Sequence, residues 1–316
     1  MQNSPSTTMK RFTPGQVWLD TAGDPIDAHG GGVMRHEGVY YWYGEHKNGK
    51  TYNDGNWDRV DVVGIRLYSS TDLLNWADRG VVLAAVDGDP SHDLHPSRIL
   101  ERPKVAYCAA TGKFVMWVHI DDAGYLTARA GVAVADSPEG PFSYLGSVKP
   151  DGEDSRDQTL FVDDDGTAYR VYASEGNATT RISLLTPDYL EHSGVAVRAF
   201  EGRSMEAQAV FKRKGRYYMI ASGCSGWDPN AARCAVADSV WGPWTELGSP
   251  CEGPGAETTF GAQSTFVLPV AGADDAFIFM ADRWNPKALY ASTYVWLPIR
   301  FVNDVPRIEW ADEWEL

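Results

Sequence analysis

Five polar residues at the starts of five similar segments are the strongest candidates for chemistry in this sequence. They are His29, Glu101, Asp157, Glu206 and Gln263, and each lies four residues before an apolar position that the segments share. Carboxylates held close together acquire different pKa values, so one can donate a proton while another stays ionised. The set therefore indicates acid–base chemistry. The alternative is that these residues merely end strands that border a wet channel.

Each of the five residues opens a segment with the pattern of two β-strands joined by a tight turn. The clearest copy covers residues 204–211 and 216–223, with Gly215 in the turn. Four copies continue into a third apolar strand and a short fourth strand, as in residues 132–142 and 234–244. Four strands repeated five times at roughly 50–70 residues predict an all-β fold, a five-bladed β-propeller. First strands line the axis of a propeller, so we expect the five polar residues to surround one end of it.

The chain has 316 residues, which is enough for one large domain, and 12 Trp and 15 Tyr, whose faces suit stacking on sugars or filling the space between blades. We expect residues 1–12 to form a disordered tail and residues 13–316 to form the propeller, which is also the catalytic domain. The polar N-terminal stretch lacks the apolar core of a signal peptide. This predicts either a cytoplasmic protein or a secreted one whose leader has been removed.

Charge and cysteine content restrict the partners. The net charge of −15 argues against nucleic acid and anionic membranes as partners, and no apolar run reaches the roughly 20 residues of a membrane-spanning helix. No two of the four cysteines form a CxxC pair, so we expect no metal site of that kind. A disulfide among Cys224, Cys234 and Cys251 and free buried thiols are both compatible with the sequence. We expect no required cofactor, and the sequence leaves open a calcium ion at the axis.

Motifs along nearly the whole chain, from about Gln16 to Trp310, resemble glycoside hydrolase family 43, and within it the exo-β-1,3-galactanase branch. These motifs are residues 28–32 (AHGGG), 40–45 (YYWYGE), 101–104 (ERPK), 155–157 (SRD), 222–227 (SGCSGW), 263–266 (QSTF) and 282–284 (DRW). The resemblance implies a five-bladed propeller that hydrolyses glycosides with inversion of configuration. It implies exo-acting release of galactose from β-1,3-linked galactan, with an oligosaccharide or polysaccharide as the partner.

The resemblance also assigns roles to the repeated positions. Glu206 matches the general acid of the family, and Asp157 matches the auxiliary aspartate that orients the acid and tunes its pKa. The position of the usual catalytic base holds His29, an absence that the galactanase branch shares. Glu101 and Gln263 match residues proposed in that branch to position or activate water.

Further residues are expected to bind the sugar. Glu45 and Glu201 fall near positions that bind hydroxyl groups in the branch, and the remaining candidates are His29, Glu175, Trp227, Asp282 and Trp284. One departure concerns the acid: Met205 and Ala207 flank Glu206, where relatives more often have Arg and Pro. The departure leaves the linkage and the leaving group open.

Inverting hydrolysis needs an acid and a base on opposite faces of the sugar, with room for water between them. We assign Glu206 as the acid and prefer Glu101 to Gln263 as the base, because a neutral amide is a poor base. Glu101 has the alternative role of binding sugar hydroxyls. Three further alternatives remain: an arabinofuranosidase or xylosidase of the same family, a sugar-binding propeller without turnover, and a protein-interaction propeller.

Overall fold

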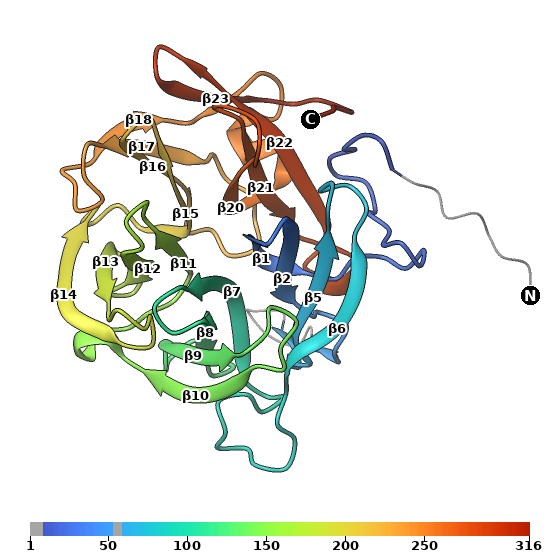
Figure 1. The fold of residues 1–316 in the computed structure, drawn as a ribbon, viewed down its shortest axis with the longest axis vertical. Coiled ribbons are helices and arrows are strands. Elements are labelled where there is room, and N and C mark those ends of the chain that lie inside the picture. Colours follow the sequence, from blue (N-terminus) through green and yellow to red (C-terminus); the bar gives the residue numbers. More distant parts are fainter. Residues whose placement is uncertain (1–8, 53–58) are drawn as a thin grey trace, which may run out of the picture.

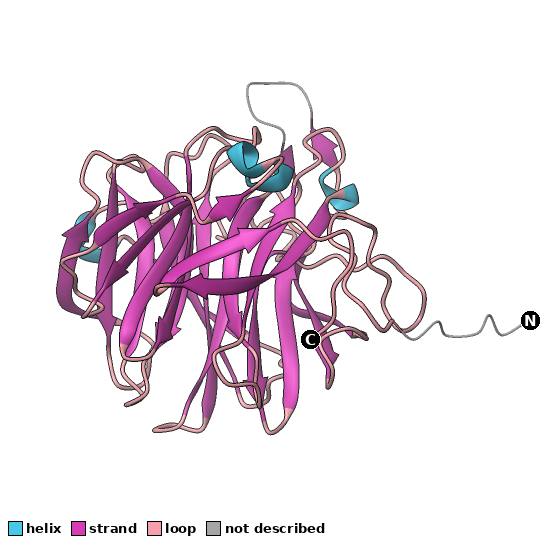
Figure 2. Cartoon of the chain, turned by 90° about the horizontal axis from the view of Figure 1, so that it is seen from above, coloured by secondary structure: helices cyan, strands magenta, loops and turns pink. Residues whose placement is uncertain are grey.

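The computed structural model describes residues 9–52 and 59–316 and is a five-bladed β-propeller, as predicted (Figure 1). The inner strands β1, β7, β11, β15 and β20 contact one another in sequence, and β20 returns to β1, so they form a closed ring around the axis. Figure 2 shows how little of the chain is helical. In the described residues, no helix has the length and apolar character needed to cross a membrane.

The first four blades are antiparallel sheets whose strands follow chain order from the axis outward. Blade one contains β1 His29–His36, β2 Val39–Glu45, β5 Gly64–Ser70 and β6 Ala77–Ala84. Blade two contains β7 Ile99–Cys108, β8 Lys113–Asp121, β9 Arg129–Ala135 and β10 Ser143–Val148. Blade three contains β11 Gln158–Val162, β12 Ala168–Ser174, β13 Thr179–Leu185 and β14 His192–Ala199. Blade four contains β15 Met205–Arg213, β16 Arg216–Gly223, β17 Arg233–Ala237 and β18 Thr245–Gly248.

Blade five has a different outer part, because a parallel pair joins β19 to β23 at its edge. From the axis outward it contains β20 Gln263–Pro269, β21 Phe277–Arg283, β22 Thr293–Val302, β23 Val305–Glu309 and β19 Cys251–Glu252. The remaining elements are the small hairpin β3 Thr51–Tyr52 and β4 Arg59–Val60, and the 3-10 turns η1 Pro150–Gly152, η2 Ala256–Gly261 and η3 Leu289–Ala291.

Aromatic packing closes the propeller between its first and last blades. Blades one and five each take their strands from one end of the chain, so the closure depends on side chains and not on a shared sheet. The ring centroid of Trp296 lies 4.8 Å from that of Trp42 and 5.0 Å from that of Trp18. Burying side chains of this size stabilises the fold by about 1.5–3 kcal/mol each. Much of the tryptophan content therefore serves the seam between blades.

The predicted disordered tail does not extend to residue 12. Phe12 is buried, its backbone N–H donates to the Trp314 carbonyl at 2.9 Å, and its ring stacks on the Trp314 ring at 4.2 Å. The Met9 N–H donates to the Asn75 side chain at 2.8 Å. The prediction overlooked that Phe12 is an apolar anchor for the C-terminal segment. The rest of the predicted tail lies outside the described residues.

Candidate active site

The five polar residues predicted from the repeat lie at equivalent positions in the structure, and we call them the axial ring: His29, Glu101, Asp157, Glu206 and Gln263. Four are in the first three residues of their inner strands, and Asp157 directly precedes β11. Their partners on the second strands are also polar in four blades: His29 pairs with Glu45, Glu101 with His119, Glu206 with Ser222, and Gln263 with Asp282. The site is thus built from two layers of repeat positions.

A β-bulge interrupts the inner strand near the axial ring in blades one, two, four and five. In three of these strands the residue after the ring position has a left-handed backbone: Gly30 with φ 58°, Arg102 with φ 55° and Ala207 with φ 57°. Such bulges re-aim side chains next to active sites. Left-handed φ costs on the order of 1–3 kcal/mol for residues other than glycine, and such strain concentrates at functional sites.

Gly30 and Gly31 allow the backbone of blade one to approach its neighbours. A Cβ atom at Gly30 would lie 1.9 Å from Oε1 of Glu45, and one at Gly31 would lie 2.1 Å from the Tyr43 carbonyl oxygen. The backbone contact excludes any side chain at Gly31, and at Gly30 a side chain would have to displace Glu45 and adopt a left-handed φ of 58°. The glycine run therefore serves close packing beside the site.

Glu206 lies in the wall of a cavity of about 370 Å³ at the end of the axis. Its Oε1 accepts a hydrogen bond of 3.0 Å from Gln263, and its Oε2 accepts one of 3.3 Å from Asn177. Burial and then the negative charge of Asp157 raise the pKa of Glu206 to about 8, although Arg102 opposes the shift. Glu206 is therefore protonated at neutral pH and able to act as a general acid.

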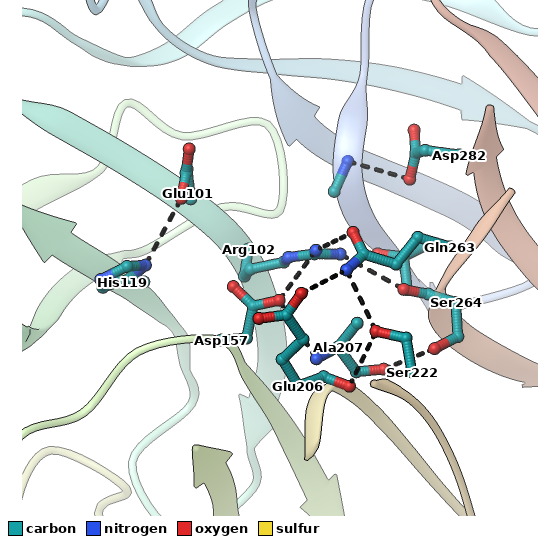
Figure 3. Close-up of polar contacts among 12 residues, drawn as sticks. Glu101, Arg102, His119, Asp157, Glu206, Ala207, Ser222, Gln263, Ser264 and Asp282 are labelled. Carbon is teal, nitrogen blue, oxygen red and sulfur yellow. Dashed lines mark hydrogen bonds and ion pairs between the residues drawn. The ribbon is translucent and has the colours of Figure 1, made fainter. Parts of the chain in front are cut away.

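Asp157 is tied to the strand that carries Glu206. Its Oδ2 accepts from the Arg102 guanidinium at 2.8 Å and from the backbone N–H of Ala207 at 3.1 Å. The second bond fixes the bulge directly after the acid. The carboxylate can thus act on Glu206 both through its charge and through the backbone (Figure 3).

Arg102 is the central residue that the sequence analysis missed. It is buried, and its Nη2 donates to Oε1 of Gln263 at 2.6 Å while also pairing with Asp157. Its backbone N–H donates to Oε1 of Glu45 at 2.8 Å. The motif at residues 101–104 contained the signal, since Arg102 follows an axial-ring residue. The bulge that turns its side chain into the axis was not visible in the sequence.

Every polar atom of the Gln263 amide is engaged. Oε1 accepts from Arg102 and, at 3.0 Å, from Nε1 of Trp284, while Nε2 donates to Glu206 and, at 3.1 Å, to Ser222. With two donors on its oxygen, the amide lacks a free lone pair for a proton of water. This arrangement holds Glu206 and argues against Gln263 as the base.

Glu101 lies in the same cavity and is surrounded by donors. The Tyr125 hydroxyl donates to Oε1 at 2.9 Å, and the Lys47 ammonium lies 3.6 Å from the same atom. Burial alone would raise its pKa, but Lys47 and His119 outweigh burial and hold the pKa at about 2. Glu101 is therefore ionised throughout the neutral range and is a weak base.

Three predicted sugar-binding residues do line the cavity: Glu45, Trp227 and Trp284. The Trp227 and Trp284 rings lie 5.3 Å apart at 67° and form one aromatic corner. Tyr125 also lines the cavity and was not predicted. Aromatic faces beside carboxylates suit a sugar ring, which has apolar C–H faces and polar edges.

Two predicted sugar-binding residues, His29 and Asp282, do not line the cavity. Nδ1 of His29 contacts Oδ1 of Asp282 at 3.1 Å, and Oδ2 of Asp282 accepts from the Gly30 N–H at 3.2 Å. Both side chains are almost completely buried, and His29 stacks on Tyr294 at 5.0 Å. The prediction of direct sugar contact is corrected, because these residues support the bulge behind the wall.

Glu175 and Glu201 also lie outside the set that lines the cavity. Glu175 pairs with Arg198 at 2.6 Å and with Arg181 at 3.3 Å, and Glu201 pairs with Arg198 at 3.1 Å with 59% of its side chain exposed. Both carboxylates are directed into a surface ion-pair network. Their predicted role as sugar contacts is corrected accordingly.

A cation at the axis does not fit the residues present. Glu101, His119 and Asp157 offer donor atoms within 4.8 Å of one another. Positive charge is already present at both carboxylates, since Lys47, which also pairs with Glu45, lies 3.6 Å from Glu101, and Arg102 lies 2.8 Å from Asp157. The carboxylates around His119 raise its pKa to about 9 against the effect of burial, so the ring carries protons and not lone pairs.

The four cysteines are all free thiols, which excludes the disulfide considered above.

Comparisons with known proteins agree with this architecture. The family model for glycosyl hydrolases family 43 matches residues 26–251. A solved family 43 β-1,3-galactosidase with galactodeoxynojirimycin is 43% identical, with a TM-score of 0.91 over 96% of this chain and 100% of that chain. An exo-β-1,3-galactanase from Phanerochaete chrysosporium with β-1,3-galactotriose is 35% identical, with a TM-score of 0.88 over 98% of this chain and 68% of that chain.

The curated relatives found by sequence include xylosidases and arabinoxylan arabinofuranohydrolases. A xylan 1,3-β-xylosidase from a Vibrio species is 27% identical over 197 residues, which are 57% of this chain and 36% of that protein. The chain spans about a third to a half of the length of the first such relatives.

Proposed function

Because the chain belongs to glycosyl hydrolases family 43, we propose that it is an exo-acting galactan 1,3-β-galactosidase that hydrolyses β-1,3-linked galactan with inversion. The observation that carries the proposal is the buried Glu206 held beside the Asp157–Arg102 ion pair, where burial and the charge of Asp157 raise its pKa. Support for galactan comes from the two structural relatives, whose similarity extends over nearly the whole chain.

The size of the cavity supports attack at a chain end. Its volume of about 370 Å³ is at the lower end of the range of ligand pockets, roughly 300–1,000 Å³. Arg102 and Gln263 line it and are bound to each other across the axis. A pocket of this kind accepts a terminal sugar more readily than the middle of a polysaccharide, which needs an open cleft.

Glu206 donates its proton to the glycosidic oxygen as the bond breaks. Asp157 keeps the acid protonated before the reaction through its negative charge, and Gln263 orients the carboxyl group. Protonation of the leaving group by a positioned acid contributes roughly 10²–10⁴-fold to the rate.

Glu101 acts on the water as an acceptor that orients it. The transition state resembles an oxocarbenium ion, so positive charge develops on the sugar and an ionised carboxylate nearby stabilises it. With a pKa of about 2, Glu101 removes a proton efficiently only once the water has become acidic by bonding to carbon. This role modifies the predicted one, in which Glu101 was the base in the ordinary sense.

The proposed reaction uses only side chains of this protein, so it requires no cofactor. Glu206 supplies the acid, Glu101 orients the water and stabilises the developing positive charge, and Asp157 helps to keep the acid protonated.

Another glycosidase of the family is the second candidate. The curated relatives include β-xylosidases and arabinoxylan arabinofuranohydrolases at 25–29% identity. Xylose and galactose differ by one hydroxymethyl group and by the configuration at C4, and a pocket discriminates one extra carbon group by only about 1–3 kcal/mol. Parallel assays on aryl galactosides, xylosides and arabinofuranosides therefore separate the candidates.

Product analysis on β-1,3-galactan tests the proposal. We expect the wild type to release galactose whose first-formed anomer, followed by NMR, is inverted relative to the substrate. Glu206→Gln is expected to lose at least about a hundredfold in turnover. Glu201→Gln is the matched control, because it makes the same chemical change on the surface and should retain wild-type turnover.

Other outcomes would overturn parts of the proposal. Release from a xyloside or arabinoside alone would discard galactan and retain the acid. Binding of β-1,3-galactan without any product would indicate a sugar-binding propeller, and near-normal turnover of Glu206→Gln would remove Glu206 as the acid.

A further inference from the structure

His119 lies directly behind Glu101, and no step of the proposed reaction uses it. The two residues are cross-strand partners on β7 and β8, and His119 is only 1% exposed. Nδ1 of His119 is 3.5 Å from Oε2 of Glu101, and Nε2 is 3.0 Å from Oδ2 of Asp121 (Figure 3 shows the first contact). The imidazole therefore bridges two carboxylates.

Asp121 is held rigidly by the loop that follows β8. Its Oδ1 accepts from the backbone N–H groups of Asp122, Thr127 and Ala128 at 2.8–3.0 Å, and from the Thr127 hydroxyl. Burial opposes the charge of Asp121, but its contact with His119 and these bonds lower its pKa to about 2. Oδ2 is thus an ionised acceptor with a fixed direction.

Both nitrogens of His119 face carboxylate oxygens: Nε2 lies within hydrogen-bond distance of Asp121, and Nδ1 has the longer contact with Glu101 and no hydrogen bond. A doubly protonated imidazole is a cation, which matches the two negative charges on either side. Burial alone would lower the pKa of His119, yet its contacts with Asp121 and Glu101 raise it to about 9. A pKa of about 9 corresponds to a positively charged ring at neutral pH.

The two oxygens of Glu101 have different surroundings. Oε1 takes the Tyr125 hydroxyl at 2.9 Å and lies 3.6 Å from the Lys47 ammonium. Oε2 has the longer contact with His119, and this distance leaves it room to accept from a sugar hydroxyl or a water. Arg102 and Lys47 add positive charge around Glu101, while Glu45 and Asp157 add negative charge.

We propose that His119, oriented by Asp121, is a positioning residue that keeps Glu101 ionised and directs its Oε2 toward the substrate or the attacking water. The proposal rests on the proposed function for its kinetic consequence only, since the contact itself exists without substrate. In this arrangement the chain Asp121–His119–Glu101 links a rigid loop to the reacting centre, and a neutral side chain at position 119 would weaken it.

The direct test is the titration of Glu101 by NMR in protein labelled with ¹³C at glutamate carboxyl carbons, with the signal assigned by its absence in Glu101→Gln. We expect the wild-type signal to titrate below pH 4, and His119→Gln to raise its midpoint by at least about one pH unit. His36→Gln is the matched control. His36 lies at the end of β1 that is far from the axial ring, so its replacement should leave the midpoint unchanged. An unchanged midpoint in His119→Gln would overturn the proposal.

A second titration, of His119 in Glu101→Gln, keeps the proposal testable if His119→Gln does not fold. Linkage requires that Glu101 stabilises the charged imidazole as much as the imidazole stabilises the carboxylate. We therefore expect the ¹⁵N signals of His119 to report a doubly protonated ring at pH 7.5 in the wild type, and its pKa to fall by about one unit or more in Glu101→Gln. A neutral ring in the wild type would contradict the proposal.

Kinetics on β-1,3-galactan connect this pair to turnover. We expect His119→Gln to lower kcat/KM at least about tenfold and to move the acidic limb of its pH profile upward, yet to add little in a Glu101→Gln background. If the two substitutions lowered kcat/KM by independent factors that multiply in the double variant, and the acidic limb did not move, His119 would have a structural role only. A wild type inactive on galactan would refute the proposed function, and the two titrations would still decide the role of His119.

Discussion

Gln263 donates a hydrogen bond of 3.0 Å from Nε2 to Oε1 of Glu206. Its oxygen is held by Arg102 and Trp284, so the amide cannot rotate to present a different group to the acid. The proton that Glu206 carries at neutral pH is thereby confined to the other oxygen, Oε2. An amide at position 263 thus determines which oxygen of the acid can protonate a leaving group.

Gln263→Glu should make Glu206 a weaker acid, while the side chain at position 263 keeps nearly the same size and shape. A carboxylate at this position faces Glu206 across about 3 Å, so the pair holds a proton more tightly and the pKa of Glu206 rises further. We expect turnover at pH 7 to fall at least about tenfold and the alkaline limb of the pH–rate profile to move upward. A profile that coincides with the wild type would show that Gln263 does not control the acid.

Asp157→Asn should move the same limb in the opposite direction. Burial and then the charge of Asp157 raise the pKa of Glu206 to about 8, so the wild type loses activity as the pH rises through that value. Removing the charge lowers the pKa and leaves Arg102 free to favour ionised Glu206. We expect the alkaline limb of kcat/KM to shift down by at least about one pH unit. The measurement is the pH–rate profile, with Asp164→Asn as the control, because the Asp164 side chain is 84% exposed in a turn of blade three.

Glu206→Gln should stabilise the fold, more at pH 8 than at pH 5. The pKa of Glu206 is higher in the folded protein than in the unfolded chain, so its burial costs stability increasingly as pH rises from about 4.5 toward 8. Glutamine has no such cost. We expect a gain on the order of 1–3 kcal/mol at pH 8, measured by urea unfolding against Glu201→Gln. Equal gains at both pH values would mean that the pKa of Glu206 is not raised.

The positions of the axial ring could be predicted because the repeat itself encodes them. A strand begins at the same place in every blade, so residues such as Glu101 and Glu206 fall at one end of the axis whatever the loops do. The directions in which the neighbouring side chains point could not be predicted in this way. Arg102 points into the axis because its backbone is left-handed, a conformation that no arginine signals by its type.

The wrong sugar-binding assignments have a related cause. Spacing places His29 and Glu201 near the site but cannot show which way a side chain points. His29 is drawn inward by Asp282, and Glu201 is drawn outward by Arg198. The partner of His29 comes from blade five and is brought near only by the tertiary structure, whereas the partner of Glu201 lies three residues earlier in the same segment.

Arg102→Lys should retain much of the stability and lose most of the activity. The guanidinium contacts Asp157 and Gln263 at once, whereas an ammonium is a compact charge that cannot span both. We expect turnover to fall about a hundredfold and the free energy of unfolding to fall by only about 1–2 kcal/mol. Arg213→Lys is the matched control, because Arg213 is also buried and pairs with two carboxylates, Asp275 and Asp304, away from the cavity. Comparable turnover losses in both variants would mean that the position in the axis has no special importance.

Chelation of metal ions should leave the enzyme unchanged. The donor atoms of Glu101, His119 and Asp157 lie within 4.8 Å, a separation that would allow an ion between them. Binding a cation there would require His119 to lose a proton that two carboxylates hold, and would repel Lys47 and Arg102. We therefore expect EDTA treatment, and then millimolar calcium, to change neither Tm nor turnover on β-1,3-galactan. A calcium-dependent rise in Tm that Asp157→Asn abolishes would place an ion at the axis and would require a different charge balance around Glu101.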